Sequence, residues 1–227
     1  LFLKRTSGGY GHTYTDQHAT GSGGNICLLS PVAPDGKVTP LIPELQGGLF
    51  DRFDLSWDAT RVVFGYKKKI DKDQKDKRGQ VFRIYEIQLD PKTGLMKPGS
   101  LKQLTFSDAA EAEAIKCHAW QGRGVDRGVD DMDPCYLPDG GFAFISTRCQ
   151  SYGRCHGGRY TPSYMLYRGQ LDGSDIRQLS FGEANEWDPS VMADGTATAL
   201  YYGNYTGNPH MTAEPRSIPG SKKVMSL

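Results

Sequence analysis

Short runs of alternating apolar and polar residues recur along the whole chain. Examples lie at residues 61–64, 82–90, 142–145 and 164–167, which are rich in Val, Ile, Phe and Tyr. Such runs of four to eight residues are typical of half-buried β-strands. Asp-Gly pairs stand between several of the runs and supply the positive φ that tight hairpin turns need. The pattern therefore predicts a chain of short strands joined by tight turns.

The predicted strands fall into an internal repeat. One unit covers residues 52–106, a second covers 133–181, and a third opens at residue 188. The first residue of each unit, which we call its leading residue, stands six positions before the aspartate of a predicted turn. These pairs are Arg52 and Asp58, Asp133 and Asp139, and Asp188 and Asp194. The first two units close on Gln-Leu-Thr-Phe and Gln-Leu-Ser-Phe, and a weaker half-unit lies at residues 25–39.

Four short strands in roughly 45–60 residues are typical of one β-propeller blade. We therefore predict an all-β fold, a partial β-propeller of about three to four four-stranded blades. Residues 107–116 predict one short linking helix, with Asp108 at the N-cap and Glu111 at the capping-box position. The mixed charges of residues 67–78 predict a solvated loop between two strands.

Composition agrees with a turn-rich chain and excludes several functions. The 227 residues include 28 glycines and 13 prolines, a larger share than the roughly 12 % of average proteins. With a net charge of +1 we expect no nucleic-acid partner. No apolar run exceeds four residues, so we expect no membrane insertion. Both ends resemble strands, so we expect residues 1–227 to be one β-propeller segment of a longer multidomain protein.

Residues 148–160 form the segment richest in reactive side chains. They lie between two predicted strands, where a long loop on a rigid scaffold often carries function. Cys155 and His156 match the end of a Cys-x-x-Cys-His haem attachment site, but Cys149 stands too far upstream. The structural alternative is a disulfide between Cys149 and Cys155, or one that involves Cys135. A metal other than haem iron is a third interpretation.

A second candidate site lies near the N-terminus. His12, Asp16 and His18 offer three potential ligands within seven residues, and borderline metals accept such nitrogen and oxygen donors. In an extended segment, side chains at even spacing point the same way, so these three could converge on one ion. The alternative is that they are polar anchors of a loop.

Other motifs favour structural roles. The acidic residues of 130–133 lack the spacing of a calcium loop. Asp133 recurs as Asp188, each before a proline, so a turn or strand-capping role explains it better. The glycine-rich residues 21–24 are not followed by the Lys-Ser or Lys-Thr of a phosphate-binding loop, and no hydrolase nucleophile elbow occurs.

Two sets of sequence motifs resemble known families. The Asp-Pro-x-x-x-x-Asp-Gly and Tyr-x-x-x-x-Asp-Gly elements, closed by Gln-Leu-Ser/Thr-Phe, resemble the PD40-type blades of TolB-like propellers over residues 25–200. Longer strings resemble the hydrazine synthase alpha subunit and its many uncharacterised relatives, over nearly the whole chain. These strings lie at residues 8–18, 53–56, 131–140, 146–149, 185–190, 203–212 and 216–220.

The resemblance implies a periplasmic or extracellular protein of several domains, with other domains or subunits of a larger exported assembly as partners. In hydrazine synthase members a c-type haem follows Cys-x-x-Cys-His, a Tyr four residues after the His binds iron, and the His turns to zinc. Cys155, His156 and Tyr160 match that pattern, whereas Cys149 departs from it. The resemblance therefore implies haem c or zinc at this segment, with His156 also a candidate metal ligand.

We expect the chain to be an exported propeller scaffold or binding domain, part of a haem- or metal-containing redox protein. If the protein is an enzyme, the resemblance implies an oxidoreductase. The alternative is a non-catalytic TolB-like propeller that binds a protein or ligand and has a disulfide-pinned loop. A propeller associated with a peptidase is a weaker alternative, because it needs a catalytic domain that these residues lack.

Overall fold

The computed structural model describes residues 1–5, 23–69, 81–107, 109, 111, 128–149, 152–155, 159–181, 185–202 and 213–217. Within these ranges the regular structure is nearly all β-strand, with one short 3-10 helix, η1 (Pro43–Leu45), and helical backbone at Ala109 and Glu111. No helix in the described ranges is long and apolar enough to cross a bilayer.

The strands form antiparallel sheets of sequential neighbours. The first sheet holds β1 (Phe2–Arg5), β2 (Gly24–Ser30) and β3 (Lys37–Pro40); the second holds β4 (Leu49–Leu55), β5 (Arg61–Lys67), β6 (Arg83–Gln88) and β7 (Lys102–Gln103). The third holds β8 (Asp131–Tyr136), β9 (Gly141–Ser146), β12 (Met165–Gln170) and β13 (Arg177–Gln178); the fourth holds β14 (Asn185–Val191), β15 (Ala197–Tyr202) and β16 (Ala213–Ser217). A separate hairpin, β10 (Tyr152–Cys155) and β11 (Arg159–Pro162), lies between β9 and β12 in the chain.

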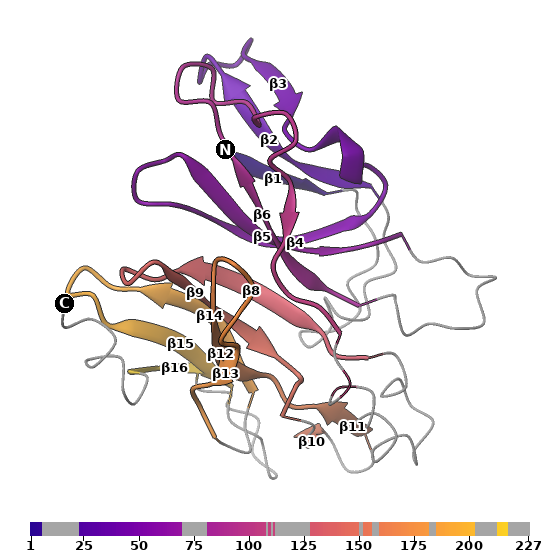
Figure 1. Cartoon of the computed structure of the whole chain (residues 1–227), viewed down its shortest axis with the longest axis vertical. Coiled ribbons are helices and arrows are strands. Elements are labelled where there is room, and N and C mark those ends of the chain that lie inside the picture. The colour runs from indigo at the N-terminus through magenta and orange to yellow at the C-terminus, as the bar shows by residue number, and fades with distance from the viewer. Residues whose placement is uncertain are drawn as a thin grey trace.

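The first strands of successive sheets pack against one another. β4 contacts β8, and β8 contacts β14 (Figure 1). β4 and β8 run in the same direction, because Asp133 binds Asp51 and, three residues later in both strands, Tyr136 binds Asp54. Four-stranded meanders whose first strands surround a common axis are the blades of a propeller. The predicted fold class, a partial β-propeller, is confirmed.

The strands β4, β8 and β14 are the inner strands of their blades. Each of them contains a β-bulge close to the residue where its repeat unit begins. The pairing register shifts between Phe50 and Phe53, between Met132 and Cys135, and between Trp187 and Ser190. Asp133 and Asp188 lie at the bulges with φ of 48° and 52°, a region that aspartate tolerates better than most residues. The Asp-Pro elements of the sequence are therefore bulges in the inner strands.

The closing string of each unit holds the outermost strand in place. In both complete blades a tyrosine hydroxyl donates to a glutamine side chain, whose amide group donates to a backbone carbonyl two residues later. The residues are Tyr85, Gln103 and Thr105 in one blade, with distances of 3.1 and 2.7 Å, and Tyr167, Gln178 and Ser180 in the other, with the same distances. The closing strings Gln-Leu-Thr-Phe and Gln-Leu-Ser-Phe thus make the same hydrogen bonds in both blades.

Apolar side chains fill the space between neighbouring sheets. Ile26, Phe50 and Phe64 belong to a cluster of the first and second sheets. A second cluster joins the second and third sheets and includes Val63, Ile84, Phe142, Phe144, Met165 and Tyr167. Each blade is therefore stabilised by burial of apolar area against the next.

Two local predictions need correction or completion. Lys67, predicted to begin a solvated loop, ends β5 with 1 % exposure, and its ammonium lies 4.5 Å from the centroid of the Phe82 ring. The prediction was wrong there because the electron-rich face of the Phe82 ring and the negative charge of Asp130 stabilise a buried ammonium. Lys68 and Lys69 are exposed, and residues 70–80 lie outside the described residues. Of the predicted helix at residues 107–116, Ser107, Ala109 and Glu111 are described; Ala109 and Glu111 are helical, and Ser107 is not.

Candidate functional site

A pocket of about 490 Å³ lies between the inner strands β4, β8 and β14. Its lining comes from equivalent positions of the three strands, residues 52–55, 133–136 and 188–191, together with Trp57 of the turn after β4. The repeat places these positions at similar depths because each inner strand follows the same course. We call this the axial pocket, and its volume is in the range of small-molecule sites, about 300–1,000 Å³.

The three leading residues of the repeat meet in the axial pocket. The Nε of Arg52 lies 3.4 Å from Oδ1 of Asp133 and also forms an ion pair with Oδ1 of Asp188. Backbone contacts secure the same cluster: Oδ2 of Asp133 accepts the N–H of Asp188 at 3.2 Å, and Oδ2 of Asp51 accepts the N–H of Asp133 at 2.8 Å. Gly65 leaves room for this arrangement, because a Cβ there would come within 2.9 Å of the Asp51 side chain.

Electrostatics make Asp133 unusual among these groups. Burial, followed by the nearby carboxylates of Asp51 and Asp188, raises the pKa of Asp133 well above its usual value, and Arg52 only partly opposes the effect. Asp133 therefore keeps its proton to a higher pH than an exposed aspartate. Burial also raises the pKa of Asp54, against the hydrogen bonds that its carboxylate accepts from Tyr136 and Leu55.

The mouth of the axial pocket is apolar. Trp57 is 70 % exposed and Leu55 is 39 % exposed, and both line the pocket beside Pro134 and Pro189. An exposed indole offers a flat apolar surface and one N–H donor to a ligand. The pocket thus combines a charged interior with an aromatic rim.

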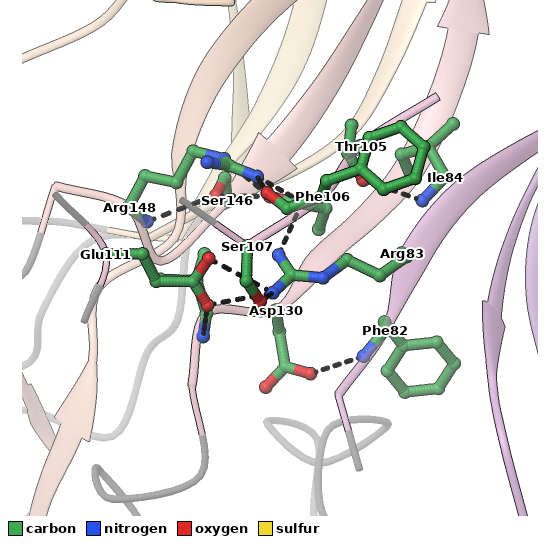
Figure 2. A network of polar contacts seen from close by, with 12 residues as sticks. Phe82, Arg83, Ile84, Thr105, Phe106, Ser107, Glu111, Asp130, Ser146 and Arg148 are labelled. Carbon is green, nitrogen blue, oxygen red and sulfur yellow. Dashed lines mark hydrogen bonds and ion pairs between the residues drawn. The ribbon is translucent and has the colours of Figure 1, made fainter. Parts of the chain in front are cut away.

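A buried ion network lies at the start of β8, outside the axial pocket (Figure 2). Asp131 is fully buried and accepts hydrogen bonds from Ser146, from Arg83 and, through two nitrogens, from Arg148. Arg83 also binds Glu111 at 2.8 Å. Burial alone would raise the pKa of Asp131, but Arg148 and Arg83 lower it below its usual value.

This network serves as a connection between segments. Glu111 accepts the N–H of Val129 and pairs with Arg83, so it links the residues just before β8 to β6. Asp130 accepts the N–H of Phe82 at 2.8 Å and so links β8 to the blade before it. These bonds support the strand-capping role expected for the acidic run at 130–133. Among the described residues, no group of three or more His, Cys, Asp or Glu side chains is placed to hold a metal ion.

The predicted haem segment is only partly described. The structure shows a hairpin where the sequence predicted a loop, with Cys155 paired with Arg159 and Tyr160 paired with Arg154. Cys149 precedes this hairpin, and its Sγ lies 3.4 Å from the carbonyl oxygen of Ser163. His156 lies outside the described residues, and so do His12, Asp16 and His18. The structure therefore tests neither candidate ligand set.

One of the disulfide alternatives is not found. Cys135 is a free thiol that is 5 % exposed, and burial raises its pKa to about 12. A thiol with so high a pKa is almost wholly protonated and unreactive at neutral pH. The pairing of Cys149 with Cys155 stays a prediction, because the side chain of Cys155 is not described.

Comparisons with known proteins found similar solved structures, at low sequence identity. No family model and no curated protein matches the chain. A putative TolB from Agrobacterium tumefaciens is 19 % identical, with a TM-score of 0.46 over 82 % of this chain and 48 % of that chain. A puromycin-hydrolyzing peptidase of Mycobacterium tuberculosis is 11 % identical, with a TM-score of 0.43 over 78 % of this chain and 25 % of that chain.

Hydrazine synthase of Kuenenia stuttgartiensis is also similar, at 14 % identity and a TM-score of 0.38 over 88 % of this chain and 35 % of that chain. This chain thus spans less than half the length of each of these three proteins. The identities do not assign it to the hydrazine synthase family, and the propeller fold rests on the sheet arrangement described above.

Sequence reasoning missed the pocket residues Arg52, Trp57 and Asp188 as functional candidates. A signal was present, because the repeat aligned Arg52 with Asp133 and Asp188. Equivalent positions of the inner strands of a propeller face a common axis. An arginine at one of these positions and aspartates at the others therefore predict an ion pair between blades. That step requires knowing which strand of each unit is innermost.

Proposed function

We propose that this chain is the binding scaffold of a β-propeller protein and that it binds its ligand in the axial pocket. One observation carries the proposal: three repeat units bring Arg52, Asp133 and Asp188 into one pocket with an exposed tryptophan at its mouth. Concave sites with an apolar lining and a few convergent polar groups are typical of ligand binding.

The test uses the whole chain and a panel of small carboxylates, amines and neutral aromatic compounds. Binding is detected by saturation-transfer NMR, and hydrogen exchange then locates each compound that binds. We expect protection at residues 52–57, 133–136 and 188–191. Protection confined to other segments would overturn the proposal.

A matched pair of variants sharpens this test. Trp57→Ala removes an exposed aromatic ring that lines the pocket, whereas Phe181→Ala removes one that is 82 % exposed and does not line it. We expect Trp57→Ala to weaken binding by about three- to tenfold and Phe181→Ala to leave it unchanged. Equal effects of the two variants would count against the axial pocket.

A haem or zinc role is a second proposal, and it rests on the family resemblance. Cys149 does not fit the attachment motif, since it lies six positions before Cys155 and its Sγ contacts the Ser163 carbonyl oxygen. The natural full-length protein, made with a c-type cytochrome maturation system, should then show a Soret band or bind zinc stoichiometrically. A colourless, zinc-free preparation would remove this proposal.

The resemblance also supports a proposal about location and partners. It suggests an exported protein whose other domains or subunits complete a larger assembly. Fractionation of cells that express the full-length protein, followed by cross-linking, tests both points. Recovery of the protein solely from the cytoplasm would contradict export.

A further inference from the structure

Arg52 carries the hydrogen-bond donors that the axial pocket offers to a ligand. Its closest contacts with Asp133 and Asp188 are made by Nε. Within the described part of the chain, its two terminal amino groups donate no hydrogen bond to another residue, and 58 % of the side chain is exposed. Because Arg52 lines the axial pocket, these amino groups are available to a molecule that enters it.

The carboxylates of the pocket are partly engaged by the protein. The two oxygens of Asp54 accept the N–H groups of Leu55 and Tyr136, each at 2.9 Å. Oδ2 of Asp133 accepts the N–H of Asp188, and Oδ1 of Asp188 pairs with Arg52. The pocket therefore offers a ligand the terminal amino groups of Arg52 as charged donors, beside aspartate oxygens that are only partly engaged.

Burial and the carboxylates of Asp51 and Asp188 raise the pKa of Asp133, so at a given pH this carboxyl group carries less negative charge than an exposed aspartate does. Asp188 is the carboxylate that pairs most closely with Arg52. An incoming anion meets the terminal amino groups of the Arg52 guanidinium beside this ion pair. Arginine binds carboxylates well in this setting because its planar donors match the two oxygens.

The shape of the pocket adds an apolar requirement. Trp57 and Leu55 are exposed at the mouth, and Pro134 and Pro189 form part of the walls. Contact of these apolar side chains with a hydrocarbon or aromatic group is favourable, because it removes apolar surface from water. A ligand that satisfies both ends has a carboxylate beside Arg52 and an apolar group beside Trp57.

We propose that the axial pocket binds a carboxylate joined to an apolar group, with Arg52 on the carboxylate and Trp57 on the apolar part. The inference rests on the proposed function and narrows it to one ligand class. A free aromatic or aliphatic acid and the C-terminus of a peptide share this chemistry.

The experiment is calorimetric titration of the whole chain with probes that differ in one group. The small probes are 3-phenylpropionate, 3-phenylpropionamide and phenethylamine, and the peptide probes are N-acetyl-Ala-Phe as the acid and as the amide. We expect each acid to bind at least about tenfold more tightly than its amide, since a charged hydrogen-bonded pair is lost. The two arms show whether a small acid or a peptide terminus binds more tightly.

Variants assign the preference to its residues. Arg52→Gln should abolish the difference between acid and amide, and Trp57→Ala should weaken both while keeping that difference. Arg177→Gln is the matched control, because Arg177 is 54 % exposed on the outer strand β13 and does not line the pocket. Since Arg52→Gln also removes an ion pair, its fold is checked by circular dichroism, and Trp57→Ala provides the second test.

The outcomes separate this inference from the proposed function. Equal or tighter binding of the amide or the amine in the axial pocket would overturn the carboxylate preference and leave the binding scaffold standing. Acid binding that Arg177→Gln weakens as much as Arg52→Gln would also overturn the inference. If no compound of either panel binds at residues 52–57, 133–136 and 188–191, both proposals fail.

Discussion

Asp133 of β8 connects its own blade to both neighbouring blades. Its positive φ turns its N–H toward Asp51 of one neighbouring inner strand, while its carboxyl group accepts the N–H of Asp188 of the other. A non-glycine residue in this conformation stores strain of about 1–3 kcal/mol. Hydrogen bonds on both sides offset that strain and hold the bulge in place.

The raised pKa of Asp133 predicts a pH-dependent stability. In the unfolded chain this carboxyl titrates near its ordinary value of 3.8. Above that pH the folded state binds more protons than the unfolded state, so the free energy of unfolding falls as pH rises. Asp133→Asn removes this titration and keeps a side-chain oxygen for the N–H of Asp188.

We therefore expect Asp133→Asn to match the parent near about pH 4 and to be more stable than the parent near about pH 8. Thermal unfolding followed by circular dichroism across this range measures the difference. A stability difference that stays constant with pH would contradict the assignment of the raised pKa to this residue.

The outer strands show how the repeat stabilises whole elements. β7 and β13 have two residues each, so few backbone hydrogen bonds hold them to their sheets. Gln103 and Gln178 add side-chain bonds to a tyrosine hydroxyl and to the backbone just after each strand. The glutamine of the closing string thus helps to hold the last strand, β7 or β13, against its sheet.

Gln178→Ala should destabilise the protein by about 1–2 kcal/mol, because the Tyr167 hydroxyl and the Ser180 carbonyl lose their partner. Urea unfolding measures the change. Gln88→Ala, at an exposed position of β6, is the control and should lie within about 0.5 kcal/mol of the parent. Similar losses in the two variants would mean that the Gln178 bonds contribute little.

At the scale of the whole molecule, the buried ion network ties separate segments together. Asp131 of β8 binds Arg83 of the preceding blade and Arg148 beside the β10–β11 hairpin, and Arg83 binds Glu111 of the connecting segment. Removing one partner from such a network leaves buried charges uncompensated, which costs more than the network contributes when intact.

Asp131→Asn should therefore lower the free energy of unfolding by about 3–5 kcal/mol, since two buried arginines lose their shared carboxylate. Asp175→Asn disrupts an exposed ion pair with Arg177 and should change it by about 1 kcal/mol or less. Both are measured by urea unfolding of the full chain. A loss for Asp131→Asn no larger than that for the control would show that the network is not stabilising.

The sequence by itself determined the strands, the turns and the repeat, because alternation and Asp-Gly chemistry act over a few neighbouring residues. It also placed Arg52, Asp133 and Asp188 in equivalent positions. Only the tertiary structure decided that these three meet in one pocket and that Lys67 is buried on Phe82. The reason is physical: local patterns assign the faces of a strand, whereas the packing of one sheet on the next decides which charges become neighbours and lose water.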